Sequence, residues 1–288
     1  MRKLALCVAL VTFAACGPSV SGDDDDDDGV DARVDAPIDG SGIDGEELDF
    51  SKVYAHSGQN LYRLDTVTLL PVLIGPFGLG TTSITDIAVD KDDRMLGITL
   101  DDIYTIDVTT GTATLLIALP ETAPNLSSLS FVPIDLDNPD GAERLVAADS
   151  EGDVLEIDQI TGVTSVLGNY GVTAAGAMQI RSSGDIVAIA GFGIYATVTV
   201  GEPFSNPDYL AQINPISWAA TLIGGGTPHD KIFGLGYWRN TLYGFIDRGN
   251  NLGSIVALDV NTGVASPVNM GTIQWFGAGV TTDAPVID

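Results

Sequence analysis

The sequence predicts an all-β fold, a five-bladed β-propeller, preceded by a signal peptide and a disordered acidic tether. Three observations lead to this prediction: a strand motif that recurs five times, unpaired strands at the two ends of the repeated region, and the lack of an extended helical pattern. The motif is a short apolar strand that ends in an acid or an amide. Its copies end at Asp65, Asp107, Asp158, Asn214 and Asp259, which are 42, 51, 56 and 45 positions apart. A strand repeat of this length is typical of propeller blades.

The strands around the motif predict how the ring closes. Each blade divides into strands A to D from the axis outward, with the motif as strand C. The first blade has a strand B at Val53–His56 with no strand A before it, and the last strand A, at 276–282, has no strand B after it. We expect these two segments to pair, because pairing removes two open sheet edges. No apolar pattern of helical period runs beyond about ten residues without Gly or Pro, so no substantial helix is expected.

The turn after strand C explains most of the repeated acids. Three copies read Asp-x-x-Thr-Gly and end at Gly111, Gly162 and Gly263. The carboxylate can accept hydrogen bonds from amides two or three residues on, and the glycine supplies the positive φ that closes the hairpin. We therefore predict that these aspartates are structural. In the fourth blade, which lacks this turn, strands A and B are expected at residues 177–181 and 186–190.

The segment from Ile103 to Thr114 resembles the repeat of bacterial propeller domains that read Leu-Tyr-x-Ile-Asp-x-x-Thr-Gly-x-Ala-Thr. Residues 255–265 are similar to it, whereas the copy that ends at Asn214 departs from it. The resemblance covers most of residues 51–288. It implies the propeller fold and leaves the function open, because propellers host many unrelated activities.

The first residues are typical of an export signal. Arg2 and Lys3 precede an apolar run of ten residues, too short to span a bilayer, and two alanines then precede Cys16. The stretch Phe-Ala-Ala-Cys resembles the lipobox of bacterial lipoproteins, although that motif usually begins with Leu. The resemblance implies cleavage after residue 15, acylation of Cys16, and a lipid-anchored protein of the outer membrane or cell surface. The alternative is an ordinary signal peptide. The segment after Cys16 contains no cysteine, so it has no disulfide.

Residues 16–50 form the predicted tether, and residues 51–288 form the predicted propeller. Residues 17–50 carry 13 acids and one base, a net charge of −12, with little apolar content, so an extended, disordered segment is expected. Residues 51–288 carry 26 acids and nine bases, a net charge of −17. Such a domain does not bind nucleic acid through general electrostatics, and anionic lipids repel it. Membrane attachment is therefore expected through the lipid alone, in a protein expected to be a monomer.

Few side chains indicate catalysis. Asp86 is the one acid expected to point into the central channel, whereas glycoside hydrolysis needs a pair of carboxylates. His56 is expected in a strand away from the axis, and His229 lies in a loop beside Asp230. No ligand spacing supports a metal site around them. The exported segment also lacks the Gly-x-Ser-x-Gly nucleophile elbow and the Gly-x4-Gly-Lys phosphate loop.

Two groups of acids have the composition of a calcium site. In the first group, Asp24, Asp26, Asp28 and Gly29 lie at positions 1, 3, 5 and 6 of an EF-hand-like loop, and Asp35 lies at position 12. Flanking helices and a Glu at position 12 are missing, so a solvated tether is the preferred interpretation. The second group is expected in a loop between strands A and B of the third blade. It comprises Asp135, Asp137, Asp140 and Glu143. A polar surface loop is the default interpretation there, so no cofactor is expected.

The best candidate binding face carries the D–A and B–C loops, where aromatic and acidic side chains gather on a rigid scaffold. The candidate residues on this face are Asp86, Phe192, Phe204, His229 and Trp275. The sequence favours a non-enzymatic module that binds a protein or a glycan. One alternative is a hydrolase or lyase acting in the channel, which two facing carboxylates there would favour. A second alternative is a scaffold in an envelope complex.

Overall fold

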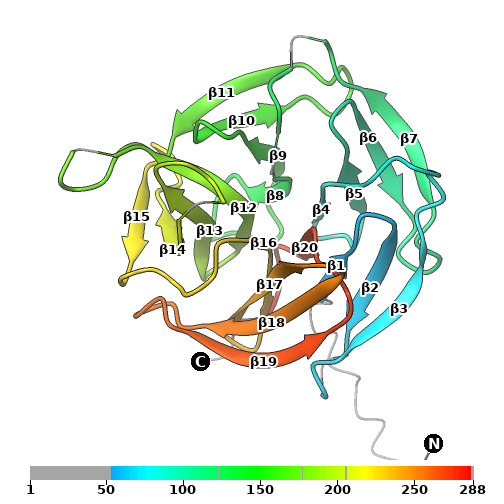
Figure 1. The fold of residues 1–288 in the computed structure, drawn as a ribbon. Helices are drawn as coiled ribbons and strands as arrows, with labels where there is room; N and C mark the ends of the chain where they lie inside the picture. Colours follow the sequence, from blue (N-terminus) through cyan, green and yellow to red (C-terminus); the bar gives the residue numbers. More distant parts are fainter. Residues whose placement is uncertain are drawn as a thin grey trace, which may run out of the picture. The chain divides into compact units, whose positions relative to one another are not determined.

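A computed structural model describes residues 53–286, except residues 66, 122, 127, 177 and 205. They form 20 strands in five sheets of four, which surround a central axis as a five-bladed propeller (Figure 1). The prediction of an all-β, five-bladed propeller is confirmed. Cys16, the predicted signal peptide and the predicted tether lie outside the described residues. Within the described part of the chain, no helix is long and apolar enough to cross a bilayer.

The strands of each blade follow one another from the axis outward. Blade I contains β20 (Gly277–Val280), β1 (Val53–His56), β2 (Asn60–Leu64) and β3 (Pro71–Pro76). Blade II contains β4 (Asp86–Val89), β5 (Met95–Ile98), β6 (Asp102–Ile106) and β7 (Ala113–Ala118). Blade III contains β8 (Ser130–Pro133), β9 (Glu143–Ala148), β10 (Asp153–Ile157) and β11 (Thr164–Asn169).

The two inner strands are longer in the last two blades than in the first three. Blade IV contains β12 (Ile180–Ile189), β13 (Gly193–Val200), β14 (Asp208–Ile213) and β15 (Ala220–Ile223). Blade V contains β16 (Ile232–Trp238), β17 (Thr241–Gly249), β18 (Leu252–Leu258) and β19 (Ala265–Gly271). The innermost strands β20, β4, β8, β12 and β16 neighbour one another around the axis and are almost entirely buried. Apolar side chains fill the spaces between adjacent blades and form the core.

Strand β20 lies at the axial edge of blade I although it comes from the far end of the chain. Its four residues pair antiparallel with β1, from Val280 opposite Val53 to Gly277 opposite His56. Strand β1 is therefore hydrogen-bonded on both sides, to β20 and to β2. Blade I combines the first and the last strand of the described chain.

Blade IV departs from the prediction. The sequence predicts separate strands at 177–181 and 186–190, but one strand, β12, runs through this region and the second strand of the blade is β13. The prediction was wrong because the Ser-Ser-Gly-Asp stretch at 182–185 has the composition of a turn. The extra residues form a β-bulge between Ser182 and Ile186. Gly184 is needed there, because a Cβ would overlap the carbonyl oxygen of Ile232.

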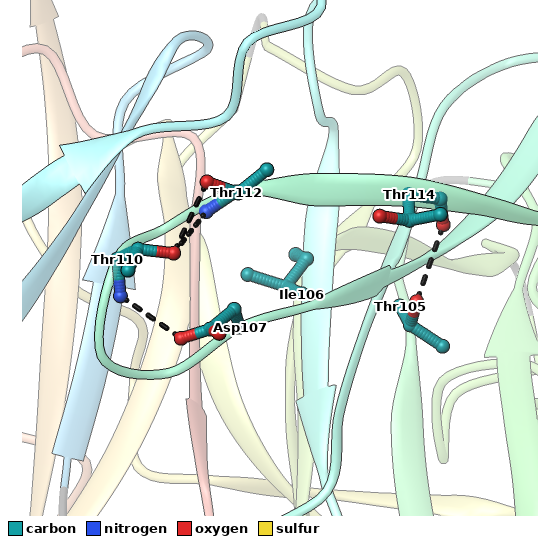
Figure 2. A pocket seen from close by; sticks show the side chains of 6 residues that line it. All are labelled: Thr105, Ile106, Asp107, Thr110, Thr112 and Thr114. Carbon is teal, nitrogen blue, oxygen red and sulfur yellow. Dashed lines mark hydrogen bonds between the residues drawn. The ribbon is translucent and has the colours of Figure 1, made fainter.

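The turns after the third strand of each blade are built alike. Oδ1 of Asp107 accepts hydrogen bonds from the amides of Thr109 and Thr110 at 2.8 and 3.0 Å, and Figure 2 shows the second of these. The Thr109 hydroxyl and these amides hold the pKa of Asp107 below its usual value. Equivalent amide bonds reach Asp65, Asp158, Asn214 and Asp259. The structural role predicted for the turn aspartates is confirmed, and the hollow in Figure 2 is the inside of a hairpin turn.

The fifth residue of each turn has a positive φ, which glycine adopts without strain. Three blades have glycine there, but blade I has Leu69 with a φ of 56° and blade IV has Trp218 with a φ of 61°. Trp218 is buried in the core between blades III and IV. Burial of an indole ring stabilises by a few kcal/mol, more than the roughly 1–2 kcal/mol that a left-handed conformation costs. This explains why the turn forms without the Thr-Gly sequence.

Candidate functional site

Asp86, the expected channel acid, is fully buried at the axis. Its Oδ2 accepts a 2.7 Å hydrogen bond from the amide of Leu129, which leads into β8 of blade III. Its Oδ1 accepts a 2.9 Å hydrogen bond from the amide of Ile87 and lies 3.9 Å from Nε2 of His56. His56 belongs to the second strand of blade I, as predicted, yet its ring reaches the axial acid. Gly277 makes this possible, because a Cβ there would overlap both side chains.

A second acid, Asp185, lies close to Asp86. Asp185 lies on β12 directly after the bulge glycine and is also fully buried. Its carboxyl group accepts hydrogen bonds from the amides of Leu235 in blade V, at 2.9 Å, and of Ile186, at 2.6 Å. Burial raises the pKa of Asp185 well above its usual value, and the neighbouring Asp86 carboxyl raises it further. Burial likewise raises the pKa of Asp86, so the two acids do not both ionise at neutral pH.

Asp86 and Asp185 each connect their own blade to the next one. Each carboxyl group uses an oxygen to accept an amide of the next blade along the ring, which leaves that buried amide satisfied. Side-chain exposure is essentially zero for His56, Asp86 and Asp185, so no substrate atom can reach them in this conformation. The carboxyl groups of Asp86 and Asp185 therefore lie close together at the axis, but both are buried and closed to a substrate.

Asp208 forms a third buried connection. It begins β14, and its Oδ2 accepts a 2.7 Å hydrogen bond from the amide of Ile232, the first residue of β16 in blade V. The hydroxyl of Ser183 donates to its Oδ1. Burial raises the pKa of Asp208 to about 7, and the nearby charge of Asp230 acts in the same direction.

A cavity of about 420 Å³ lies at the mouth of the axis, on the face of the D–A and B–C loops. Its apolar lining consists of Phe204, Phe233, Phe276, Leu100, Leu126 and Pro203. Its polar lining consists of Thr85, Asn125, Ser150, Ser182 and Ser183. All of these side chains are uncharged. The cavity therefore combines three aromatic rings with five hydroxyl or amide groups, a composition suited to an uncharged ligand.

The five candidate residues of the sequence analysis do not form one site. Phe204 lines the cavity, and Asp86 directly follows the lining residue Thr85. Trp275 is buried in the core, where its ring makes edge contacts with Tyr62 and Phe245 at 5.4 Å. The two other candidates lie away from the cavity lining. Phe192 sits in the turn between β12 and β13, and His229 sits half-buried in the loop before β16.

The environments of Phe192 and His229 are local. The Phe192 ring lies 5.2 Å from the ring of Tyr195 and 4.7 Å from that of Tyr237. The backbone carbonyl of His229 accepts hydrogen bonds from the Asp208 amide and the Thr227 hydroxyl. Partial burial lowers the pKa of the His229 imidazole. These contacts give both residues a role in packing the loops around them.

The acids considered for calcium occupy different surroundings. The Asp135 carboxylate accepts the amide of Asp137 at 3.0 Å in a local turn. Glu143, at the start of β9, accepts the Thr282 hydroxyl and the Lys91 amide, and burial raises its pKa. Within residues 53–286, apart from the five internal gaps, no group of three or more His, Cys, Asp or Glu side chains could hold a metal ion. The polar surface loop stays the prediction for this segment, with calcium binding as the alternative.

Sequence reasoning missed Asp185, Phe233 and Phe276. Asp185 lay in the stretch that resembled a turn, so its strand was not recognised. Phe233 and Phe276 lie at or next to the starts of predicted A strands, where aromatic residues are commonly core. The available signal was positional: the start of every A strand lies at the same mouth of the axis, so side chains there converge.

No protein-family model and no curated protein matches the sequence. Similar solved structures include a chain of a nidogen/laminin complex, at 14% identity over 80% of this chain and 97% of that chain, with a TM-score of 0.48. TolB from Acinetobacter baumannii is 14% identical over 80% of this chain and 66% of its own, with a TM-score of 0.45. An auxiliary nutrient binding protein from Bacteroides thetaiotaomicron is 11% identical over 75% of this chain and 53% of its own, with a TM-score of 0.44. At these values they carry no functional conclusion for this chain.

Proposed function

We propose that this chain is a lipid-anchored protein of the bacterial envelope whose propeller binds an uncharged ligand in the axial cavity without converting it. The Phe-Ala-Ala-Cys stretch and the acidic residues 17–50 support the anchor and the tether. The cavity carries the binding proposal, because three aromatic rings and five polar side chains converge there on a rigid scaffold.

The chemistry of the lining favours binding over catalysis. The described side chains around the cavity include no carboxylate, imidazole or thiol, the groups that act as acid, base or nucleophile in most hydrolytic sites. Ser182 donates its hydroxyl hydrogen to the carbonyl of Gly184, and Ser183 donates to Asp208. The described residues that line the cavity include no histidine that would activate a serine as a nucleophile.

The binding role is tested by filling the cavity. Ser150 is an exposed lining residue between β9 and β10, so Ser150→Trp is expected to occupy the cavity with an indole ring and to leave the sheets intact. Arrays of envelope proteins and glycans are probed with the full-length protein and with this variant. Ligands that the wild type retains and the variant loses support the cavity. Equal retention by both proteins would show that the cavity is not the binding site.

The anchor is tested with Cys16→Ser. Without the thiol the chain cannot be acylated at this position, so the variant is expected in the soluble fraction while the wild type stays with the membranes. Fractionation after carbonate extraction, followed by quantitative immunoblotting, measures the distribution. A variant that remains entirely in the membrane fraction would contradict the anchor.

A second candidate function is a hydrolase or lyase, and the adjacent Asp86 and Asp185 carboxyl groups are the observation that favours it. Their raised pKa values suit general acid–base chemistry. Their burial argues against it, since a substrate would first have to separate the blades. Product analysis after incubation with envelope glycans decides the matter: turnover that Asp185→Asn abolishes would favour the enzyme.

A further inference from the structure

We infer that the ligand of the axial cavity is a neutral glycan and that Phe204 is the residue on which a sugar ring stacks, an inference that rests on the proposed binding function. The cavity volume of about 420 Å³ lies in the range of sites for small organic ligands. A sugar ring has an apolar C–H face, which matches the aromatic side chains of the lining, and an edge of hydroxyl groups, which matches its polar side chains.

The backbone at Phe204 supports a ligand-contacting role for its ring. Its φ is 59°, a left-handed conformation that costs a bulky residue on the order of 1–2 kcal/mol. Phe204 is nevertheless 54% exposed, so burial does not offset this strain as it does at Trp218. Its ring meets Phe233 edge-on, with centroids 5.7 Å apart. The strained loop thus holds an aromatic face at the cavity mouth, where a ligand could cover it.

The hydroxyl groups of the lining favour a ligand that donates hydrogen bonds. The Thr85 hydroxyl donates to the carbonyl of Ile98 at 3.0 Å, and the Ser182 hydroxyl donates to the carbonyl of Gly184 at 3.2 Å. The Ser183 hydroxyl donates to Asp208. What the oxygens of Thr85 and Ser183 retain for a ligand is acceptor capacity. Sugar hydroxyls can donate to them, while the C–H face of the same ring covers an aromatic side chain.

Charge and desolvation exclude the competing ligand classes. The described side chains of the cavity lining carry no charge that could pair with an anion, and the domain has a net charge of −17, so an anionic glycan is repelled. An apolar side chain of a protein partner would bury the lining acceptors without donors, at a cost of about 1–3 kcal/mol for each unsatisfied group. A neutral, hydroxyl-rich ligand meets neither penalty.

The test is calorimetric titration of the full-length protein in detergent with cellotetraose, maltotetraose and mannotetraose, and with tetragalacturonate as the anionic counterpart. We expect binding of at least one neutral tetrasaccharide and none of tetragalacturonate. Phe204→Gly should raise the Kd about tenfold, through lost stacking. Its melting temperature should stay equal or rise, because glycine accepts a positive φ. Ile216→Gly, at a turn residue that is 87% exposed and outside the cavity lining, is the control and should leave the Kd unchanged.

Asn125→Leu separates a glycan from an apolar partner, because it replaces a polar lining group with an apolar one of similar size. It should weaken tetrasaccharide binding, whereas it would strengthen the binding of an apolar protein side chain. Binding of tetragalacturonate alone, or neutral binding that Phe204→Gly leaves unchanged, overturns the inference. If no sugar binds but an envelope protein is retained and lost with Ser150→Trp, the glycan inference fails and the binding function stands. If neither sugars nor proteins bind, both fail.

Discussion

Three buried aspartates connect neighbouring blades through backbone amides. Asp86 of blade II accepts the amide of Leu129 before blade III, while Asp185 and Asp208 of blade IV accept amides of blade V. Each carboxyl group thereby satisfies a donor at the inner edge of the next sheet. Because burial disfavours the charged form, the pKa of each acid is raised. Folding stability must then depend on pH in a direction opposite to that of an ordinary surface acid.

Asp208→Asn is expected to stabilise the protein near pH 8 and to change little at pH 4. The native pKa of about 7, against 3.8 for an exposed aspartate, means that the folded state keeps a proton that the unfolded chain releases as the pH rises above 4. This contribution to stability is fully present below pH 4 and is lost as the pH rises through 7, a loss of up to about 4 kcal/mol. Asparagine stays neutral at every pH, so the variant does not lose this stability as the pH rises.

Urea unfolding at pH 4, 6 and 8 measures this effect. Asp107→Asn is the matched control, because Asp107 is exposed and its pKa is lowered. The contribution of Asp107 to folding stability is present above pH 4 and disappears only as the pH falls through its native pKa. Asp107→Asn therefore does not stabilise the protein at pH 8. Identical pH profiles for Asp208→Asn and the wild type would contradict the proposed protonation.

The residues of the candidate site show where sequence reasoning ends. Asp86 was predictable as an axial acid because it begins a well-marked inner strand. Asp185 was not, since a bulge glycine precedes it and gives the stretch the composition of a turn. Phe204 was predictable as a loop aromatic on the correct face. Its contact with Phe233 depends on the spatial approach of blades IV and V, which no local pattern encodes.

At the scale of single elements, turns were easier to predict than strand boundaries. An acid or amide followed by a residue of positive φ defines all five hairpins after the third strands, and it does so even where Trp218 replaces glycine. The three Asp-x-x-Thr-Gly copies are a local signal that the sequence carries fully, whereas the turns with Leu69 and Trp218 at the positive-φ position lack that signal and were not predicted. Strand β12 differs because its continuation through residues 182–185 is fixed by pairing with β13 and by the close approach of Gly184 to blade V. Such tertiary contacts override local turn composition.

Removal of residues 273–288 is expected to lower the melting temperature by on the order of 10 °C or more. The deletion takes away β20, which leaves β1 as an open edge at the axis, and it also removes Trp275 from the core between blades V and I. Thermal unfolding followed by circular dichroism measures the change. Deletion of residues 287 and 288 alone is the control. A shift of only a degree or two in the longer deletion would show that β20 contributes little to holding blade I in the ring.

At the scale of the whole molecule, the arrangement of the blades in a ring determines which side chains line the cavity. Five inner strands meet at one axis, so their first residues converge at a single mouth and form the cavity. The five copies of the motif and the unpaired strands at the two ends were sufficient to predict the number of blades. The identity of the converging side chains required the ring itself, because they come from four different blades and from the segment before β20. Directly beneath the cavity, the sealed acids hold the same strands together.

The double pairing of β1 has a mechanical consequence. A pull transmitted through the residues before Val53 reaches the propeller at β1, which is flanked by β20 and β2. Such a load acts along the strand, so both sets of cross-strand bonds must shear together, whereas a strand at an open edge would peel away one bond at a time. In the proposed arrangement of lipid anchor and tether, a tensile load would therefore enter the propeller at a strand that is hydrogen-bonded on both sides.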